Sequence, residues 1–471
     1  MKCFYAQILF GLVIAMRLVG QTAQSPAPQS STVSAFERRI AELEKKMKEL
    51  DPGFVPASST SDLAERVRRL EERMNAEFAS RTPAPAAAAS PVVTAAVEPV
   101  EPLAPRGSGL QAVSVVGDFQ KASDTETRLP IAGYMDFHVN KDRGDSWRPD
   151  FHRFVLLFGH SFSNKIKFWS EFELEHSLVE GGEATGEIAL EQAYLDFLWK
   201  PALSFRAGML LSPVGIVNER HEPPSFNGVE RPFVETVIIP TTWRELGAGL
   251  TGDLGRGFRY RAYVTSALNA RFFDAEGGIT GGKMNGFDAS LRNPAKVGRL
   301  EYTGVRRMLL GTSYYTGHTG FDLPGINPRV SIYNFDGRYS VNRVDLRGLF
   351  AKTWLTRTAE LNRFLERRTG VNPNVAQEML GWYFEPAYHV FRKRPRNDLT
   401  LFTRYEKYNT QHKMADGFEV LGEFDRSSWL AGATFKPVPD VAIKFDYVWN
   451  RNRSRVVRPV SGINLGIGWW F

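Results

Sequence analysis

The chain has 471 residues but a single cysteine, Cys3, and it lacks the common hydrolase motifs. One thiol cannot form an internal disulfide or a thiolate metal site. Neither Gly-X-Ser-X-Gly nor His-Glu-X-X-His is present, and the eight histidines are scattered along the sequence, at 138, 152, 160, 176, 221, 318, 389 and 412. We therefore do not expect an enzyme, and we predict no catalytic, cofactor-binding or metal site.

Long apolar runs are also missing. No segment after the N-terminus approaches twenty consecutive apolar residues, so we expect no membrane helix in the mature chain. Residues 1–24 are predicted to be a signal peptide, because Lys2 precedes a largely apolar stretch that small and polar residues follow. A membrane anchor is the alternative, but the stretch is short and includes Gln7 and Arg17. Cleavage would remove Cys3, and a thiol-free chain suits an oxidising periplasm.

Two segments of unusual composition follow. Residues 25–79 place apolar side chains at alternating spacings of 4 and 3, as in the seam of a coiled coil: Phe36, Ile40, Leu43, Met47 and Leu50. So few heptads do not stabilise a lone helix, so we predict a short periplasmic coiled coil that needs a partner chain. A pair of marginal amphipathic helices is the alternative. Residues 80–109 are rich in alanine and proline and are predicted to be an extended, semi-rigid linker.

The remaining residues, 110–471, alternate between apolar and polar side chains in segments of a length that suits a tilted membrane strand. The last segment ends on an aromatic residue and has one apolar face: Ile463, Leu465, Ile467, Trp469 and Phe471. In a soluble protein such an edge strand would be an aggregation hazard. We therefore predict an all-β fold, a closed antiparallel transmembrane β-barrel of about 16 strands. The strands are expected near 130–140, 151–162, 164–177, 186–199, 202–211, 243–253, 257–268, 294–303, 308–317, 330–340, 342–355, 379–391, 397–409, 428–436, 440–450 and 461–471.

The connections between these strands alternate in length. Tight turns are expected at 162–163, 199–201, 253–257 and 436–440, whereas the long connections include 212–242, 269–293 and 356–378. Short turns on one rim and long loops on the other are typical of outer-membrane barrels. An even strand number puts both ends of the barrel on the short-turn, periplasmic side.

A barrel of sixteen strands encloses a lumen that side chains cannot fill, so its function depends on what narrows that lumen. Several inward positions combine opposite charges at i and i+2, which we expect to neutralise one another: Arg299/Glu301, Asp336/Arg338, Asp345/Arg347, Arg404/Glu406 and Lys444/Asp446. Less obviously paired are the basic residues that would favour anions: Lys165, Lys167, Arg206, Arg259 and Arg261. A wet lumen held by salt bridges is the alternative to a dedicated anion site.

The longest connection, 212–242, is apolar and proline-rich for a surface loop. Such a loop should fold against something, and the barrel interior is the available place. It would then form the constriction and bring Arg220, Arg231 and Arg244 to the pore mouth. The alternative is a lid that rests on the outer rim.

Several segments resemble the phosphate-selective porin O and P family. They are EQAYLDF (191–197), LSFRAGM (203–209), ERHEPPSFNGVERPFVET (219–236), TWRELGAGL (242–250), RYE (404–406) and the terminal Phe471. The resemblance covers roughly residues 130–471 and implies a trimeric, sixteen-stranded porin with its third loop folded inward. Founding members of that family carry lumen arginines and lysines for phosphate, but these are not contiguous motifs, so the resemblance assigns no individual residue here.

Together these features predict an outer-membrane porin for passive diffusion of small hydrophilic solutes or ions, with anions or phosphate as the candidates for a preference. Its expected partners are two further copies of the chain, outer-membrane lipid and the solutes, with the N-terminal arm in the periplasm. The net charge of +7 does not indicate nucleic acid, because the basic residues are mostly spread among acidic ones. The alternatives are a structural tether to periplasmic partners or the cell wall and, less favoured, a barrel enzyme.

Overall fold

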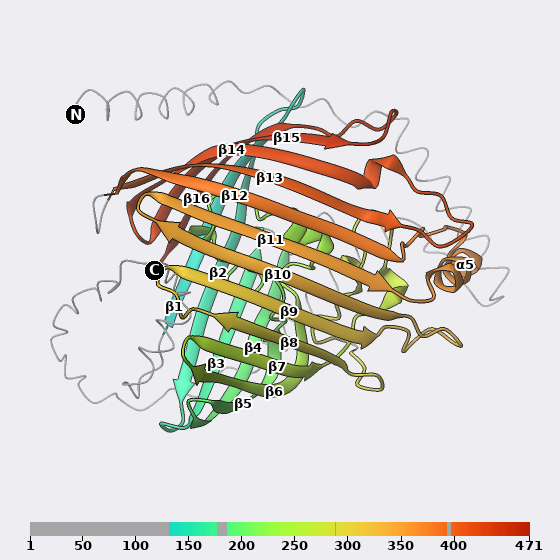
Figure 1. The fold of residues 1–471 in the computed structure, drawn as a ribbon, viewed down its shortest axis with the longest axis horizontal. Helices are drawn as coiled ribbons and strands as arrows, with labels where there is room; N and C mark the ends of the chain where they lie inside the picture. Colours follow the sequence, from blue (N-terminus) through green and yellow to red (C-terminus); the bar gives the residue numbers. More distant parts are fainter. Residues whose placement is uncertain (1–130, 177–185, 288, 393–396) are drawn as a thin grey trace, which may run out of the picture. The chain divides into compact units, whose positions relative to one another are not determined.

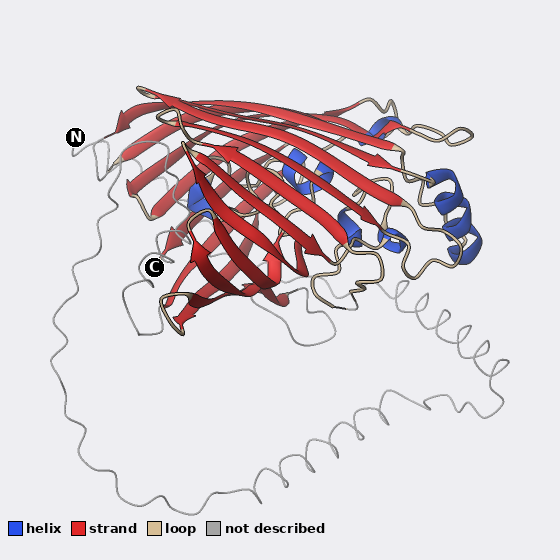
Figure 2. Cartoon of the chain, turned by 60° about the horizontal axis from the view of Figure 1, so that its bottom comes forward, coloured by secondary structure: helices blue, strands red, loops and turns tan. Residues whose placement is uncertain are grey.

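Sixteen β-strands form a closed antiparallel barrel in the computed structural model (Figures 1 and 2). The model describes residues 131–176, 186–287, 289–392 and 397–471. Each strand pairs with its neighbours in the sequence, and β1 pairs with β16, so the sheet has no free edge. The predicted fold class is confirmed for the barrel. The predicted signal peptide, coiled coil and linker lie outside the described residues.

The observed strands lie close to the predicted ones. Their bounds are β1 Ile131–Asp142, β2 Arg148–Ser161, β3 Ile166–Glu175, β4 Glu187–Lys200, β5 Leu203–Leu211, β6 Arg244–Gly255, β7 Phe258–Thr265, β8 Ala295–Tyr302, β9 Met308–His318, β10 Arg329–Val341, β11 Val344–Leu355, β12 Glu378–Arg392, β13 Asp398–Lys413, β14 Asp425–Val438, β15 Val441–Asn452 and β16 Gly462–Trp470.

Helical segments occur only in connections among the described residues. The helix α5, Thr358–Thr369, lies between β11 and β12 at one rim (Figure 1). Short helical turns are η1 Pro223–Ser225, η2 Val234–Ile238, η3 Ala270–Phe272, η4 Thr280–Gly282 and η5 Gly422–Phe424. Within the part of the chain that the structure describes, none of the helices has the length and apolar character that crossing a membrane requires.

Side chains sort by face along the strands. In β15, Ala442, Lys444 and Asp446 are buried against the interior, whereas the intervening Ile443 and Phe445 are exposed on the outside. Successive residues of a strand point to opposite faces, so the alternation in the sequence becomes an apolar exterior and a polar interior. A soluble barrel would place its charged side chains outside instead.

The two rims differ as the connection lengths predict. The turns between β4 and β5 and between β10 and β11 contain residues 201–202 and 342–343, whereas the loop between β5 and β6 spans 212–243. The two ends of the barrel meet on the short-turn rim, where Gly133 and Phe471 exchange backbone hydrogen bonds of 3.0 Å. The terminal aromatic residue therefore helps to close the sheet.

Tryptophans that are exposed on the outside of an outer-membrane barrel are candidates for its interfacial girdles. Exposed tryptophans are found on β4, β11, β12, β14 and β15, namely Trp199, Trp354, Trp382, Trp429 and Trp449. Trp243 does not belong with them, because it is fully buried at the end of the loop that precedes β6. Its ring meets that of Tyr315 edge-on, with 4.6 Å between the ring centroids.

Candidate functional site

The connection between β5 and β6, residues 212–243, runs inside the barrel, and we call it the lumen loop (Figure 2). It reaches strands far from its own ends. The backbone N–H of Val229 donates to Asp446 of β15 at 2.7 Å, and that of Val234 donates to Glu406 of β13 at 3.0 Å. The inward course of the loop is thus confirmed, and the alternative of a lid on the outer rim is wrong.

The apolar part of the lumen loop fills one side of the barrel. Val234, Ile238 and Ile239 are buried in a cluster with residues of the β7–β8 connection and of the wall of β9 to β12, including Leu268, Phe273, Ile279, Tyr315, Ile332, Met379 and Tyr383. Each buried aliphatic side chain of this size stabilises the packing by about 1.5–3 kcal/mol. This gain explains why a long, proline-rich loop folds into the barrel and does not extend into the solvent.

Basic side chains of β10, β11, β14 and β15 hold the backbone of the same loop. Lys444 Nζ donates to the carbonyl of Gly228 at 2.7 Å, and Arg338 donates to the carbonyl of Ile216 at 3.2 Å. Arg347 and Lys436 likewise donate to loop carbonyls, those of Ser225 and Pro224. The loop is therefore fixed by charged groups from four strands as well as by apolar packing.

This role corrects the expected pairing of charges at i and i+2. Two of the five predicted pairs form, Arg299–Glu301 at 2.9 Å and Arg404–Glu406 at 2.7 Å. In the other three the partners lie elsewhere: Asp336 binds Arg299, Asp345 binds His389, and Asp446 accepts from Val229. Sequence spacing finds a shared face, but it cannot foresee a loop that enters the lumen and competes for these groups.

His221 fixes the lumen loop to the wall formed by β3 and β4. Its Nε2 lies 2.9 Å from Glu191 and 3.4 Å from Glu171, and all three side chains are buried. Burial alone would lower the pKa of His221, but the two carboxylates raise it well above its ordinary value. A charged imidazole held between two carboxylates is thus favoured at this contact.

Two predicted pore residues, Arg206 and Arg261, lie inside the barrel and are paired. Arg206 donates two hydrogen bonds to Asp196 at 2.7 and 2.8 Å and lies over the ring of Tyr194. Arg261 lies 3.1 Å from Glu219 of the lumen loop and 3.3 Å from Glu301. The expectation that they are less obviously paired is therefore wrong for both.

The other candidates lie on β3, in the lumen loop and at the short-turn rim. Lys167 of β3 faces Asp196 across the β3–β4 pairing, and Arg220 of the lumen loop lies 3.7 Å from Glu301. Lys165 is exposed in the turn before β3. Arg259 has a side chain 58% exposed near the turn between β6 and β7, 3.4 Å from Asp253. These two residues lie at the rim and do not reach the constriction.

Arg231 and Arg244 meet at a cavity of about 510 Å³ on the other side of the lumen loop, against β1 to β4. Arg231 donates to the hydroxyls of Thr241 and Thr242, and Arg244 lies 3.6 Å from Glu187. Four Lys or Arg side chains line the cavity, namely Arg153, Arg231, Arg244 and Lys283. Six carboxyl side chains line it as well: Asp136, Glu173, Glu175, Glu187, Glu191 and Glu230.

Three histidines that look scattered in the sequence lie together next to this cavity. The rings of His138 and His152 are stacked with centroids 4.4 Å apart, and His176 meets His152 edge-on at 5.8 Å. The description of the histidines as scattered is therefore wrong for these three. The signal in the sequence is that Asp136 and Asp150 each stand two residues before a histidine, on strands that become neighbours.

Comparison with known proteins gives one relative in sequence. An uncharacterized protein of Aquifex aeolicus (strain VF5) is 35% identical over 342 residues, which cover 70% of this chain and 77% of that protein. The chain belongs to the same family as that protein. No protein-family model matches the chain, so membership of the phosphate-selective porin O and P family stays a prediction.

Solved porin structures are similar to this chain at low sequence identity. OmpF of Salmonella typhi, solved with daunomycin, is similar with a TM-score of 0.50 at 14% identity, over 73% of this chain and 98% of that one. The anion-selective porin from Comamonas acidovorans has a TM-score of 0.49 at 12% identity, over 74% of this chain and 100% of that one. At such an identity the likeness to OmpF concerns the fold alone. The chain therefore has a porin-like barrel.

Proposed function

We propose that the chain is an outer-membrane porin through which small hydrophilic solutes diffuse passively. The observation that carries the proposal is the sorting of side chains in a closed barrel, with apolar residues such as Phe445 outside and charged residues such as Asp446 inside. An apolar exterior suits lipid, and a polar interior narrowed by a loop suits selective passage.

The passage is proposed to follow the wall of β1 to β4. On the opposite side the lumen loop packs apolar side chains, among them Val234, Ile238 and Ile239, against β9 to β12. The cavity of about 510 Å³ lies beside β1 to β4 and is lined by ionisable side chains. A constriction of this kind selects ions by the charges at its wall.

We propose a weak preference for cations, because the cavity has six carboxyl side chains against four from Lys or Arg and the charged imidazole of His221. The family resemblance implies the opposite preference, for anions or phosphate, and Arg231 and Arg244 are the cavity residues that would provide it. The two preferences predict reversal potentials of opposite sign.

For partners, we propose outer-membrane lipid around the exposed aliphatic and aromatic side chains and two further copies of the chain. The trimer follows the family resemblance and the predicted coiled coil at 25–79. A tether to periplasmic partners would use residues 25–109 and does not exclude a pore.

The purified full chain should form open channels in planar bilayers. Under a salt gradient, a cation-favouring reversal potential is expected, and Glu187→Gln should shift it towards anions because Glu187 lines the cavity. The matched control is Glu366→Gln, an exposed carboxylate of α5 away from that cavity, which should leave the potential unchanged. Absence of channels overturns the porin proposal, and an anion-favouring potential overturns the proposed selectivity.

A further inference from the structure

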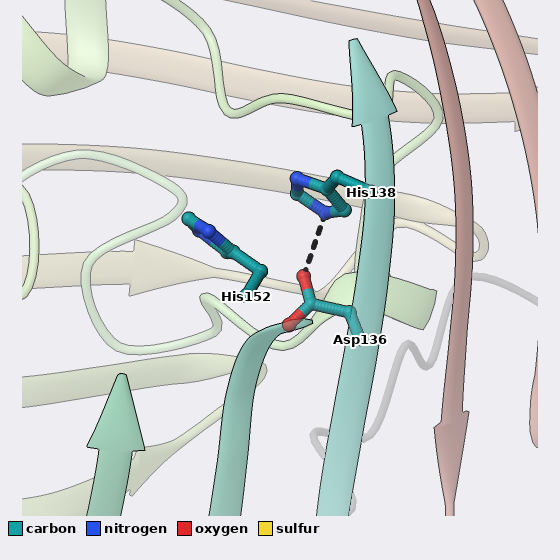
Figure 3. Close-up of side chains that lie close together, drawn as sticks. All are labelled: Asp136, His138 and His152. Atoms are coloured by element: carbon teal, nitrogen blue, oxygen red, sulfur yellow. Dashed lines mark hydrogen bonds and ion pairs between the residues drawn. The ribbon is translucent and has the colours of Figure 1, made fainter. Parts of the chain in front are cut away.

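Three side chains with metal-binding atoms lie together on the neighbouring strands β1 and β2 (Figure 3). One ligand atom each of Asp136, His138 and His152 lies within 4.8 Å of the other two. All three residues line the cavity described above, and Asp136 and His138 are almost fully buried. We propose that they bind a divalent transition-metal ion at the inner wall of the barrel.

A β-bulge brings these groups to one place. The β1–β2 pairing shifts between Asp136, which is opposite Arg153, and His138, which is opposite Asp150. β2 thus has one residue more than β1 in this interval, and two successive β2 side chains, His152 and Arg153, reach Asp136. Without the extra residue, strict alternation would send one of the two outward.

Each histidine has a carboxylate on its Nδ1 atom. Glu230 of the lumen loop lies 3.1 Å from His138 Nδ1, and Asp150 lies 3.1 Å from His152 Nδ1. Metal-binding histidines usually donate their second N–H to such a carboxylate, which fixes the tautomer and the ring orientation. This leaves the Nε2 atom of each ring for the ion.

Asp136 is held in the same way. Its Oδ1 lies 3.1 Å from Arg153 Nε, and its Oδ2 faces His138 Nε2 at 2.9 Å. The ion takes the place of the proton in this second contact. In a tetrahedral site with bonds of about 2.0–2.1 Å, ligand atoms stand about 3.3–3.4 Å apart, so the contact has to lengthen only slightly.

The two rings need a modest rotation as well. They are stacked with 18° between their planes, so the Nε2 lone pairs of His138 and His152 do not yet meet at one point. The torsion that turns an imidazole about its Cβ–Cγ bond is broad. The cavity beside the rings provides the space for that rotation.

The ligand set and the surrounding charge define the class of ion. Two imidazoles and one carboxylate suit Zn²⁺ and Fe²⁺, whereas Mg²⁺ and Ca²⁺ prefer oxygen ligands alone. The nearest charged groups are three carboxylates in contact with the two histidines, those of Asp136, Asp150 and Glu230, and the single guanidinium of Arg153. A dication compensates this negative excess, and its remaining coordination position faces the cavity.

A neighbouring triad gives the site an internal alternative. Asp150, His152 and His176 also place ligand atoms within 4.8 Å of one another, and Asp150 lies 2.8 Å from His176 Nδ1. These three residues are only half-buried, and of the three only His152 lines the cavity. The geometry therefore favours the triad of Figure 3.

The test is calorimetric titration of the EDTA-treated full chain in detergent with Zn²⁺ at neutral pH. One ion per chain is expected. Replacement of a ligand, His152→Gln, should weaken binding at least about tenfold, and Asp150→Asn should weaken it by about 10–100-fold because it removes the orienting carboxylate. The matched control is His160→Gln, on the same strand but outside the cluster, which should bind as the wild type does.

Folding of each variant is checked by its heat-dependent mobility on gels. His138→Gln would remove the histidine partner of the buried Asp136 carboxylate. The half-buried His176 is therefore replaced as a second probe, by asparagine, which tolerates the positive φ of 53° at that position. Binding that persists in His176→Asn but is lost in folded His152→Gln supports the proposal. The proposal is overturned if the wild type does not bind Zn²⁺ stoichiometrically. It is also overturned if the His152 and His160 variants bind with equal affinity, or if His176→Asn alone loses binding. None of these readouts depends on conductance.

Discussion

Arg404 is a buried cation between two buried carboxylates. Its Nε lies 2.7 Å from Glu406 and its Nη1 lies 3.0 Å from Glu385, and the three side chains are at most 1% exposed. The pair with Glu406 is readable from the sequence, because residues two apart on a strand share a face. The contact with Glu385 is not readable, since it depends on the register between β12 and β13.

Replacement of this guanidinium, Arg404→Met, should destabilise the barrel by about 3–5 kcal/mol, because it leaves two buried carboxylates without a counter-charge. The measurement is the urea midpoint of the folded, heat-modifiable form in detergent. Arg259→Met is the control: its exposed pair with Asp253 at the rim is worth about 0–1 kcal/mol. Equal shifts for the two variants would contradict the buried role of Arg404.

His221 gives the lumen loop a dependence on pH. The ordinary pKa of histidine is about 6.5. The carboxylates of Glu191 and Glu171 raise the pKa of His221 well above this value despite the burial of the side chain. Its contribution to stability is therefore complete below that ordinary value and is lost as the pH rises through the raised pKa. Motion of the lumen loop should therefore increase the open-channel noise only when the pH rises through the raised pKa of His221. His221→Gln, which cannot titrate, should have no such step, and a step that remains in this variant would point to another group.

At the scale of elements, the lumen loop is an insertion in an otherwise continuous hairpin. Ser212 N donates to Trp243 O at 2.8 Å, so the β5–β6 pairing continues to the base of the loop. Replacing residues 213–242 with Asn-Gly should close a two-residue turn there. Single-channel conductance should rise several-fold, because the protein that fills the lumen is removed.

The control for this replacement is the β15–β16 connection. Its residues 454–459 are mostly exposed, and shortening them with glycine and serine should leave the conductance unchanged. If the lumen-loop variant folds and conducts like the wild type, the loop is not the constriction, and the passage along β1 to β4 must be narrowed elsewhere.

The strands were predictable because each one obeys a local rule, and the contacts inside the lumen were not. Alternation and connection length locate all sixteen strands, including β12, where the pairing with β13 passes from Phe384 to Ala387 around Pro386. The composition of the loop predicts that it enters the barrel. The triad of Asp136, His138 and His152 requires a bulge that breaks the alternation, so the rule that finds the strands hides this site.

At the scale of the whole molecule, the barrel closes without the N-terminal arm. β1 pairs with β16 over nine residue pairs, from Tyr134–Trp470 to Asp142–Gly462, so no segment before residue 131 is needed to complete the sheet among the described residues. The predicted coiled coil at 25–79 lies outside the described residues, and its proposed task is to hold three copies together.

Deletion of residues 25–107 should therefore leave the conductance of each pore intact and lower the stability of the trimer. The first is measured in planar bilayers and the second by the temperature at which the trimer dissociates in detergent. Leu43→Asp should act like the deletion, because a charge in an a/d seam opposes helix association, whereas Glu44→Gln, beside the seam, should have little effect. Loss of conductance on deletion would instead mean that the arm assembles or gates the channel. A trimer as stable as the wild type would separate the arm from oligomerisation and leave tethering as its role.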